Sequence, residues 1–138
     1  MAIKINTEKR IFTLETKHTM YQMQADTYGV LRHLWYGAKT GCDMSYLQDY
    51  PDVGFSGNPH DAGNDRTYSL DTLPLEYAGA GIGDFRVPAV EAVHADGSCA
   101  LDLRYYSHTV KQGKYAIAGL PALYAGEDEA ETLEVVLR

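Results

Sequence analysis

The sequence predicts an all-β protein built as an antiparallel sandwich, and three observations support this fold class. Short runs in which apolar and polar residues alternate recur along the 138-residue chain. Between these runs stand glycine, proline, asparagine and aspartate, the residues that form turns. Tyrosine is abundant, with 11 copies against 3 phenylalanines and 1 tryptophan, and its ring suits a half-buried strand surface. A single domain of this length can bury a substantial core.

The N-terminal third contains three of the predicted strands. Residues 11–16 (IFTLET) and 19–24 (TMYQMQ) alternate in hydrophobicity with a period of two, as half-buried strands do. The two residues between them are enough for a hairpin turn. Residues 30–37 (VLRHLWYG) form the third predicted strand, which a glycine closes.

Residues 38–66 differ from the strands around them. Glycine, asparagine, aspartate and proline are spread through this segment, and only residues 43–48 could form a helical turn. Irregular segments of this length inside a compact domain are usually functional or disordered. Three aromatic residues, Tyr46, Tyr50 and Phe55, favour ordered packing.

The C-terminal half contains three more predicted strands. Residues 87–95 and 99–110 are joined through Asp96-Gly97, a dipeptide that favours a tight hairpin. Residues 133–138 alternate apolar and polar positions up to the end of the chain. Because this strand reaches the last residue, we expect the chain to be a piece of a longer protein.

The composition excludes several classes of function. The formal net charge is −7 and the pI is about 5.1, whereas nucleic acids and anionic membranes attract basic patches. No apolar stretch is long enough to span a bilayer, and the charged N-terminus lacks the pattern of a signal peptide. Cys42 and Cys99 follow no metal-ligand or redox spacing, so we expect free thiols in the cytoplasm.

No motif indicates a catalytic centre, a metal site or a cofactor. The glycine-rich residues 78–85 precede Pro88, which prevents the helix that a dinucleotide fingerprint requires. The histidines lack metal-ligand spacing, the serines lack a nucleophile elbow, and the acidic residues 127–134 lack the pattern of a calcium loop. Asp71 and Thr72 are interpreted as turn residues. A single sequence cannot show whether two carboxylates lie across a sugar.

Residues 64–90 (NDRTYSLDTLPLEYAGAGIGDFRVPAV) closely resemble the hallmark segment of the N-terminal domain of bacterial α-galactosidases of glycoside hydrolase family 36. Five further segments resemble this family in the same order: FTLETKHTMYQMQ, LRHLWYG, FSGNPHDAGNDR, LDLRYYSH and GLPALYAGEDEAETLEVVL. The resemblance covers residues 9–138 and implies a large two-sheet β-sandwich of the supersandwich type. In that family a following (β/α)8 barrel carries two catalytic aspartates and hydrolyses α-1,6-linked galactosides, such as raffinose-type sugars, with retention. Residues 1–138 would then form a non-catalytic domain, inactive by itself.

The resemblance also implies partners and two site residues. The partners are the barrel of the same chain and the other subunits of a homo-oligomer, expected to be a tetramer, in which each N-terminal domain completes the α-galactoside pocket of a neighbour. The residues that it lends lie in the loop 50–66, where Asp52 and Arg66 match that role. A carboxylate and a guanidinium can each bind two sugar hydroxyls. The alternative for Arg66 is an ion pair with Asp52, Asp61 or Asp65 that holds the loop.

Other interpretations stay open. A purely structural domain would make no sugar contact, and Trp35, which could stack on a sugar, is expected in the core. The alternate glycines within residues 69–90 are interpreted as a surface on which the barrel or a second subunit docks. A free-standing carbohydrate-binding module would need a row of exposed aromatic side chains on one sheet face, for which the candidates are Tyr105, Tyr106, Tyr115 and Tyr124.

Overall fold

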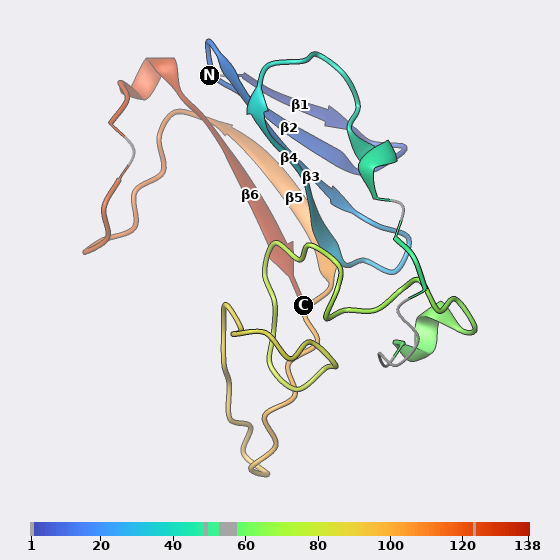
Figure 1. The fold of residues 1–138 in the computed structure, drawn as a ribbon. Helices are drawn as coiled ribbons and strands as arrows, with labels where there is room; N and C mark the ends of the chain where they lie inside the picture. Colours follow the sequence, from blue (N-terminus) through green and yellow to red (C-terminus); the bar gives the residue numbers. More distant parts are fainter. Residues whose placement is uncertain (1, 49, 53–57, 123) are drawn as a thin grey trace.

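Six strands form two antiparallel sheets in the computed structural model, which describes residues 2–48, 50–52, 58–122 and 124–138 (Figure 1). The first sheet contains β1 (Ala2–Asn6), β2 (Ile11–Glu15), β3 (Thr19–Ala25) and β4 (Leu31–Ala38) in chain order. The second sheet contains β5 (Tyr105–Gln112) and β6 (Glu131–Leu137). Three short 3₁₀ helices lie between strands: η1 (Ser45–Leu47), η2 (His60–Ala62) and η3 (Glu127–Glu129). The predicted all-β, two-sheet antiparallel fold class is confirmed.

Two rows of directly paired residues cross the first sheet on one face, which we call the inner face. Paired residues of neighbouring strands project to the same side of a sheet, so each row forms a continuous strip. The first row is Ile3, Leu14, Tyr21 and Tyr36. The second row is Ile5, Phe12, Met23 and His33.

A β-bulge in β4 sets which of its residues reach the opposite, outer face. Gln22 pairs with Trp35 and Met23 with His33, so Leu34 is the additional residue on β4. Leu34 is buried on the outer face in a cluster, and Trp35 packs half-buried against it. Trp35 Nε1 donates to Ala38 O (3.3 Å), so this side chain belongs to the edge of the core, as expected.

The chain covers the outer face with its own segment after β4. Gln22 Nε2 donates to Thr13 Oγ1 and to Cys42 O (3.0 Å each), and Met44 N donates to Gln22 Oε1 (3.0 Å). Met44 also lies in the same apolar cluster as Ile11, and it is 5% exposed. The segment after β4 therefore covers part of the outer face of the first sheet within the same chain.

The second sheet packs on the inner face over Phe12, which is 1% exposed. The Phe12 ring centroid lies 5.9 Å from that of Tyr105 and 4.9 Å from that of His108, both on β5. Tyr105 N also donates to Gly29 O (2.7 Å), and Ile3 N donates to Glu131 Oε2 at the start of β6 (2.6 Å). These contacts join the two sheets into a sandwich.

The predicted strands 11–16, 19–24, 30–37 and 133–138 are confirmed, with small shifts at their ends. No strand was predicted where β1 lies. Of the strand predicted over residues 99–110, only the second half forms, as part of β5.

The strand predicted over residues 87–95 is wrong. Val87 is 93% exposed, and among the described residues the one β-bridge of this segment is the isolated bridge between Gly79 and Val90, beside a hydrogen bond from Ala89 N to Ala78 O (2.9 Å). The turn at Asp96-Gly97 does form, since Gly97 N donates to the carbonyl of residue 94 (2.9 Å). Alternation gave a false signal here because no neighbouring strand among the described residues offers a partner.

Candidate functional site

The loop that carries Arg66 is built from successive turns. Asp65 N donates to Ala62 O (3.0 Å), at the end of η2, and Tyr68 N donates to Asp65 O (3.2 Å). The Asp65 carboxylate accepts hydrogen bonds from Thr67 N (3.0 Å) and Thr67 Oγ1 (2.6 Å), which hold its pKa below the usual range. These local bonds fix the backbone on both sides of Arg66.

Apolar packing fixes the base of this loop against the first sheet. The Tyr28 ring meets the Tyr68 ring edge-on, with centroids 4.7 Å apart. Leu70 and Leu73, which follow the loop, are 2% and 1% exposed. All buried members of this cluster are Val30, Ala62, Tyr68, Leu70 and Leu73.

Asp26, which is buried and directly follows β3, accepts hydrogen bonds at the base of the loop. Its Oδ2 accepts a hydrogen bond from Tyr68 Oη (2.6 Å), and its Oδ1 accepts from Tyr28 N and Val30 N (2.9 Å each). Arg32 Nε lies 3.3 Å from Oδ2. Burial and the hydrogen bond to Asp26 raise the pKa of Tyr68 above its usual value. The base of the loop is therefore polar, buried and rigidly bonded.

Arg104 makes a second connection to the loop. Its guanidinium binds Asp102 through Nε (2.6 Å) and Nη2 (3.0 Å) and donates to Tyr28 O (3.1 Å). Asp61 Oδ2, in η2, lies 3.9 Å from Arg104 Nη2. The hydrogen bond with Asp102 raises the pKa of Arg104. Through this residue the loop is joined to the segment just before β5.

The structure brings the two sequence-predicted site residues together. Arg66 Nε donates to Asp52 Oδ2 (3.0 Å), and the two side chains are 60% and 50% exposed. The ion pair given as the alternative for Arg66 is thus present with Asp52, whereas Asp61 faces Arg104 and Asp65 faces Thr67. An exposed ion pair contributes about 0–1 kcal/mol to stability. The pair therefore adds little to stability, and both of its members are accessible to a ligand.

A polar cavity of about 240 Å³ lies behind this loop. Asp26, Arg32, Gln48, Tyr50 and Asp65 contribute to its lining. Gln48 Nε2 donates to His33 O (2.7 Å), while Gln48 Oε1 is buried with no hydrogen-bond partner among the described residues. Arg32 Nε is the other buried polar atom of this lining without a hydrogen-bond partner among the described residues, so the cavity presents one acceptor and one donor.

The glycine-rich part of residues 69–90 packs on the chain itself. A Cβ at Gly79 would lie 2.0 Å from Leu101 O, and one at Gly81 would lie 3.0 Å from the Cα of Ala100. Gly81 also has φ +76°, and Leu101 N donates to Ala80 O (2.9 Å). The close approach that the glycines allow is therefore made to residues 100–101. The surface against which Gly79 and Gly81 pack therefore belongs to the same chain, whereas the docking hypothesis assigned it to the barrel or to a second subunit.

The other candidate residues do not form a site. Tyr105 faces the inner core, whereas Tyr106 lies at a bulge in β5 under the Arg138 guanidinium, 3.7 Å from its ring centroid. Tyr115 and Tyr124 lie outside the strands, so these four tyrosines do not form one row on a sheet face. Thr72 N donates to Ser69 O (3.2 Å), which confirms the turn that was predicted there.

The part of the chain that the structure describes contains no group of three or more histidine, cysteine, aspartate or glutamate side chains able to hold a metal ion. Within the same residues, none of the helices combines the length and the apolar character needed to cross a membrane. Cys42 and Cys99 are exposed free thiols.

Sequence reasoning missed the residues that position the loop. Asp26 carries a usable signal, because aspartate at the start of a turn that ends in glycine is typical of a β-turn, and Gly29 N does donate to Asp26 O (3.1 Å). Nothing in the sequence pattern indicates that Tyr68 or Arg104 reaches this turn, since they stand 42 and 76 positions from their partners Asp26 and Tyr28.

A family model described as the glycosyl hydrolase family 36 N-terminal domain matches residues 29–138. The chain is 53% identical over 137 residues to the bifunctional alpha-galactosidase/sucrose kinase AgaSK of Mediterraneibacter gnavus, covering 99% of this chain and 15% of AgaSK.

Two solved structures are similar to the chain over most of its length. The galactosidase domain of AgaSK superposes with a TM-score of 0.93 at 53% identity, covering 99% of this chain and 19% of that one. A variant of the GH36 alpha-galactosidase AgaA from Geobacillus stearothermophilus, in complex with raffinose, gives a TM-score of 0.82 at 40% identity, with 92% and 18% covered. The chain thus spans less than a fifth of the proteins that it matches.

Proposed function

This chain belongs to the glycosyl hydrolase family 36 N-terminal domain family, and we propose that it is the non-catalytic N-terminal domain of a retaining α-galactosidase. The observation that carries the proposal is the match to AgaSK, which is 53% identical over nearly the whole chain while the chain spans 15% of that protein. The longer protein would hydrolyse terminal α-galactosides of the raffinose type with residues that lie outside this chain. The structure of an AgaA variant with raffinose supports this substrate class.

Within this function, Asp52 and Arg66 are proposed to complete the galactoside pocket of a neighbouring subunit. Their exposure supports the proposal, because both side chains can reach a ligand outside their own domain. The base under the loop supports it too, because Tyr68 bonds to Asp26 and Asp61 faces Arg104, which anchors the segment that carries Arg66. A preorganised loop loses little conformational entropy when it binds. Carboxylate oxygens accept from sugar hydroxyls, and the guanidinium donates to them.

The remaining partners are proposals of the same kind. We expect the domain to pack against the catalytic barrel of its own polypeptide and to support a homo-oligomer, a tetramer. The location proposed for the protein is the cytoplasm, and the two exposed free thiols support a reducing compartment. Fractionation of cells, with the α-galactosidase activity followed in each fraction, tests this location.

The first experiment compares hydrolysis of a chromogenic α-galactoside by the 138-residue chain and by the longer polypeptide that contains it. We expect activity in the longer polypeptide alone, because the proposal assigns catalysis to residues outside this chain. Hydrolysis by the 138-residue chain would contradict the proposal and would place a catalytic carboxylate pair among the residues described above.

The second experiment replaces the proposed pocket residues in the longer polypeptide. Arg66→Ala should lower kcat/KM about 10- to 100-fold, the equivalent of one or two hydrogen bonds to a charged group. Asp52→Asn should lower it less, because the amide keeps one acceptor. Lys17→Ala, at the exposed turn between β2 and β3, is the control and should leave kcat/KM unchanged.

A charge exchange separates sugar binding from a role in holding the loop. If the ion pair only holds the loop, Asp52→Arg combined with Arg66→Asp should restore the activity that each single change removes. If the two side chains bind the sugar, the exchanged pair should stay defective while the oligomer, measured by light scattering, stays intact. Unchanged kcat/KM in Arg66→Ala would rule out the lent-residue role.

A further inference from the structure

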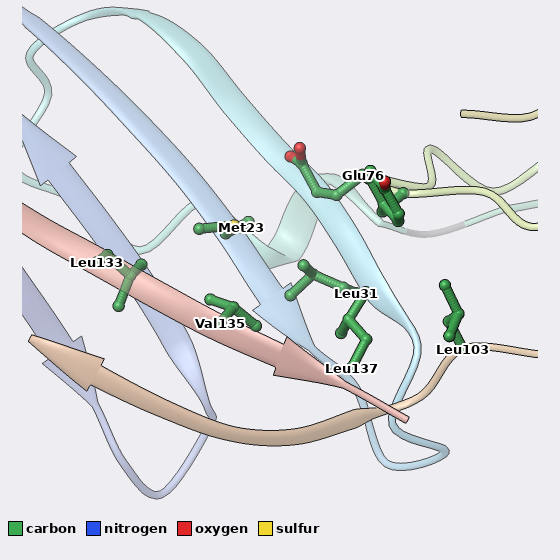
Figure 2. Close-up of a pocket in the computed structure, with 8 residues that line it drawn as sticks. Met23, Leu31, Glu76, Leu103, Leu133, Val135 and Leu137 are labelled. Atoms are coloured by element: carbon green, nitrogen blue, oxygen red, sulfur yellow. The ribbon is translucent and has the colours of Figure 1, made fainter. Parts of the chain in front are cut away.

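An apolar hollow of about 440 Å³ lies between the two sheets (Figure 2). Met23 of β3 and Leu31 of β4 form one side, and Leu133, Val135 and Leu137 of β6 form the other. These three β6 residues alternate along the strand, so they project from a single face. The hollow is the place where β6 leaves the inner face of the first sheet incompletely covered.

The uncovered surface continues along the first row of the inner face. Tyr36 is 68% exposed, and Ile3, Leu14 and Tyr21 are half-buried. In the second row, by contrast, Phe12 is fully buried under β5. Among the described residues, the first row therefore forms a strip of the sheet that no strand covers.

Glu76 lies beside the strip at Tyr21 and does not cover the row. Tyr21 Oη lies 2.5 Å from both Glu76 carboxylate oxygens, and His33 Nδ1 lies 3.0 Å from Glu76 Oε1. Burial and Glu76 raise the pKa of Tyr21 above its usual value. Because the Tyr21 hydroxyl is bonded to Glu76, what this row offers a partner is mainly ring and aliphatic surface.

The unpaired edge of β6 indicates what kind of segment could cover the strip. Among the described residues, β6 pairs with β5 alone, and Figure 1 shows no strand along the side of β6 that faces away from β5. A two-stranded sheet is marginally stable, and its unpaired edge is a template for another strand. A strand added at this edge would lie directly over the hollow and the first row.

We propose that a β-strand from the remainder of the longer polypeptide pairs with the free edge of β6 and covers the hollow and the first row. The strand would carry aliphatic side chains at alternate positions, to match Leu133, Val135 and Leu137. The proteins that this chain matches hold more than four fifths of their residues outside it, so the length for such a strand exists. A strand of the same polypeptide is tethered to β6, so its effective concentration exceeds that of a second copy in dilute solution, which favours it. The inference rests on the chain being part of a longer family polypeptide, and not on the role of Asp52 and Arg66.

Photo-cross-linking in the longer polypeptide tests whether a strand from outside residues 1–138 covers the first row. The photoreactive amino acid p-benzoylphenylalanine replaces Tyr36, whose ring it resembles in size. Tyr46 of η1, 69% exposed against 68% for Tyr36, is the matched control site. After irradiation, the expected product from the Tyr36 site has the mass of a single polypeptide, and digestion places the cross-link on a residue outside residues 1–138.

Two outcomes would overturn the inference. A product of doubled mass would assign the strip to a second copy, and cross-linking no stronger than at the Tyr46 site would mean that nothing covers it. Neither outcome bears on the activity assays, so a failure here is distinct from a failure of the proposed function.

Hydrogen exchange provides a second measurement that needs no substitution. Pairing on both edges of β6 should protect all backbone amides of the peptide 131–137 in the longer polypeptide. If β6 has one partner strand, alternate amides should exchange fast, and this pattern would contradict the proposal even if the photoreactive variant failed to fold.

Discussion

The loop 58–68 and the excursion 113–130 are both irregular, but they are held in opposite ways. The loop has a buried base, where Tyr68 is 6% exposed and bonds to Asp26. The excursion extends away from both sheets in Figure 1, and its Tyr124 is fully exposed. Both segments contain aromatic rings, so composition does not explain the difference.

What differs is the availability of partners within the chain. The loop folds back over the end of β3 and the start of β4, where Asp26 and Val30 receive it. The excursion meets no such surface among the described residues, and its apolar side chains Ile117 and Leu120 stay exposed. Exposed apolar surface of this kind marks an interaction site. We therefore expect the loop to present Arg66, which pairs with Asp52, and the excursion to pack against another part of the longer protein.

The largest effect is expected from Asp26→Asn, which breaks the buried bonds under the loop. The change leaves the Arg32 guanidinium, 14% exposed, without its carboxylate partner. Loss of one member of a buried charged pair costs about 3 kcal/mol. Urea unfolding of the chain measures the loss, with Asp61→Asn as the control, expected to cost less than about 0.5 kcal/mol because Asp61 is exposed. Equal losses of unfolding free energy in the two variants would show that the bonds to Asp26 do not stabilise the loop.

Arg86→Met should have the next largest effect. Arg86 Nη2 donates to Leu70 O (2.7 Å) and Leu73 O (2.8 Å), and its guanidinium pairs with buried Asp84 (2.8 Å). The methionine would leave Asp84 as an uncompensated carboxylate, at a cost of about 2 kcal/mol. Adding Asp84→Asn should recover part of that stability. A double variant no more stable than Arg86→Met would contradict the pairing argument.

Gly79→Ala should cost about 1–3 kcal/mol, because the added Cβ would meet the backbone carbonyl of Leu101 and overpack that contact. Gly126→Ala, in the excursion, is the matched control: its nearest neighbour would be a Glu129 side-chain atom at 3.6 Å. Thermal unfolding of both variants compares the packed segment with the open one. A similar Tm for the two would mean that residues 100–101 can move away.

A smaller, pH-dependent effect is expected at Asp43, on the segment that covers the outer face. The hydrogen bond from Lys9 Nζ (2.7 Å) lowers the pKa of Asp43 to about 2. A carboxyl whose pKa is lower in the folded state stabilises the fold above its unfolded pKa of about 4, and this stabilisation is lost as the pH falls toward 2. Asp43→Asn should therefore flatten the pH dependence of the unfolding midpoint between pH 4 and 2. An unchanged pH profile would count against this ion pair.

The smallest effect on the isolated chain is expected from Tyr124→Ser. Because the ring is fully exposed, the free energy of unfolding should change by less than about 0.5 kcal/mol. In the longer polypeptide the same variant should weaken the contact that we expect the excursion to make, which light scattering and thermal unfolding can detect. A large loss of stability in the isolated chain would mean that the excursion has its own core.

Local sequence patterns were enough to predict the fold class, the strands with strict alternation and the turns at Asp96-Gly97 and Asp71-Thr72. These features depend on residues close in the chain, through the two-residue period of a strand and the local hydrogen bonds of a turn. The same rules assigned residues 87–95 to a strand, and they failed because alternation does not reveal whether a partner strand is near.

The support of the candidate site, by contrast, comes from contacts between distant parts of the folded chain. The bond between Tyr68 and Asp26, the contact of Arg104 with Asp61, and the packing of Gly79 on Leu101 join residues far apart in sequence. Such contacts depend on which surfaces the folded chain brings together, and no local pattern encodes them. The resemblance to a known family pointed to Asp52 and Arg66 in the loop 50–66, but their 3.0 Å pairing is a result of the folded chain.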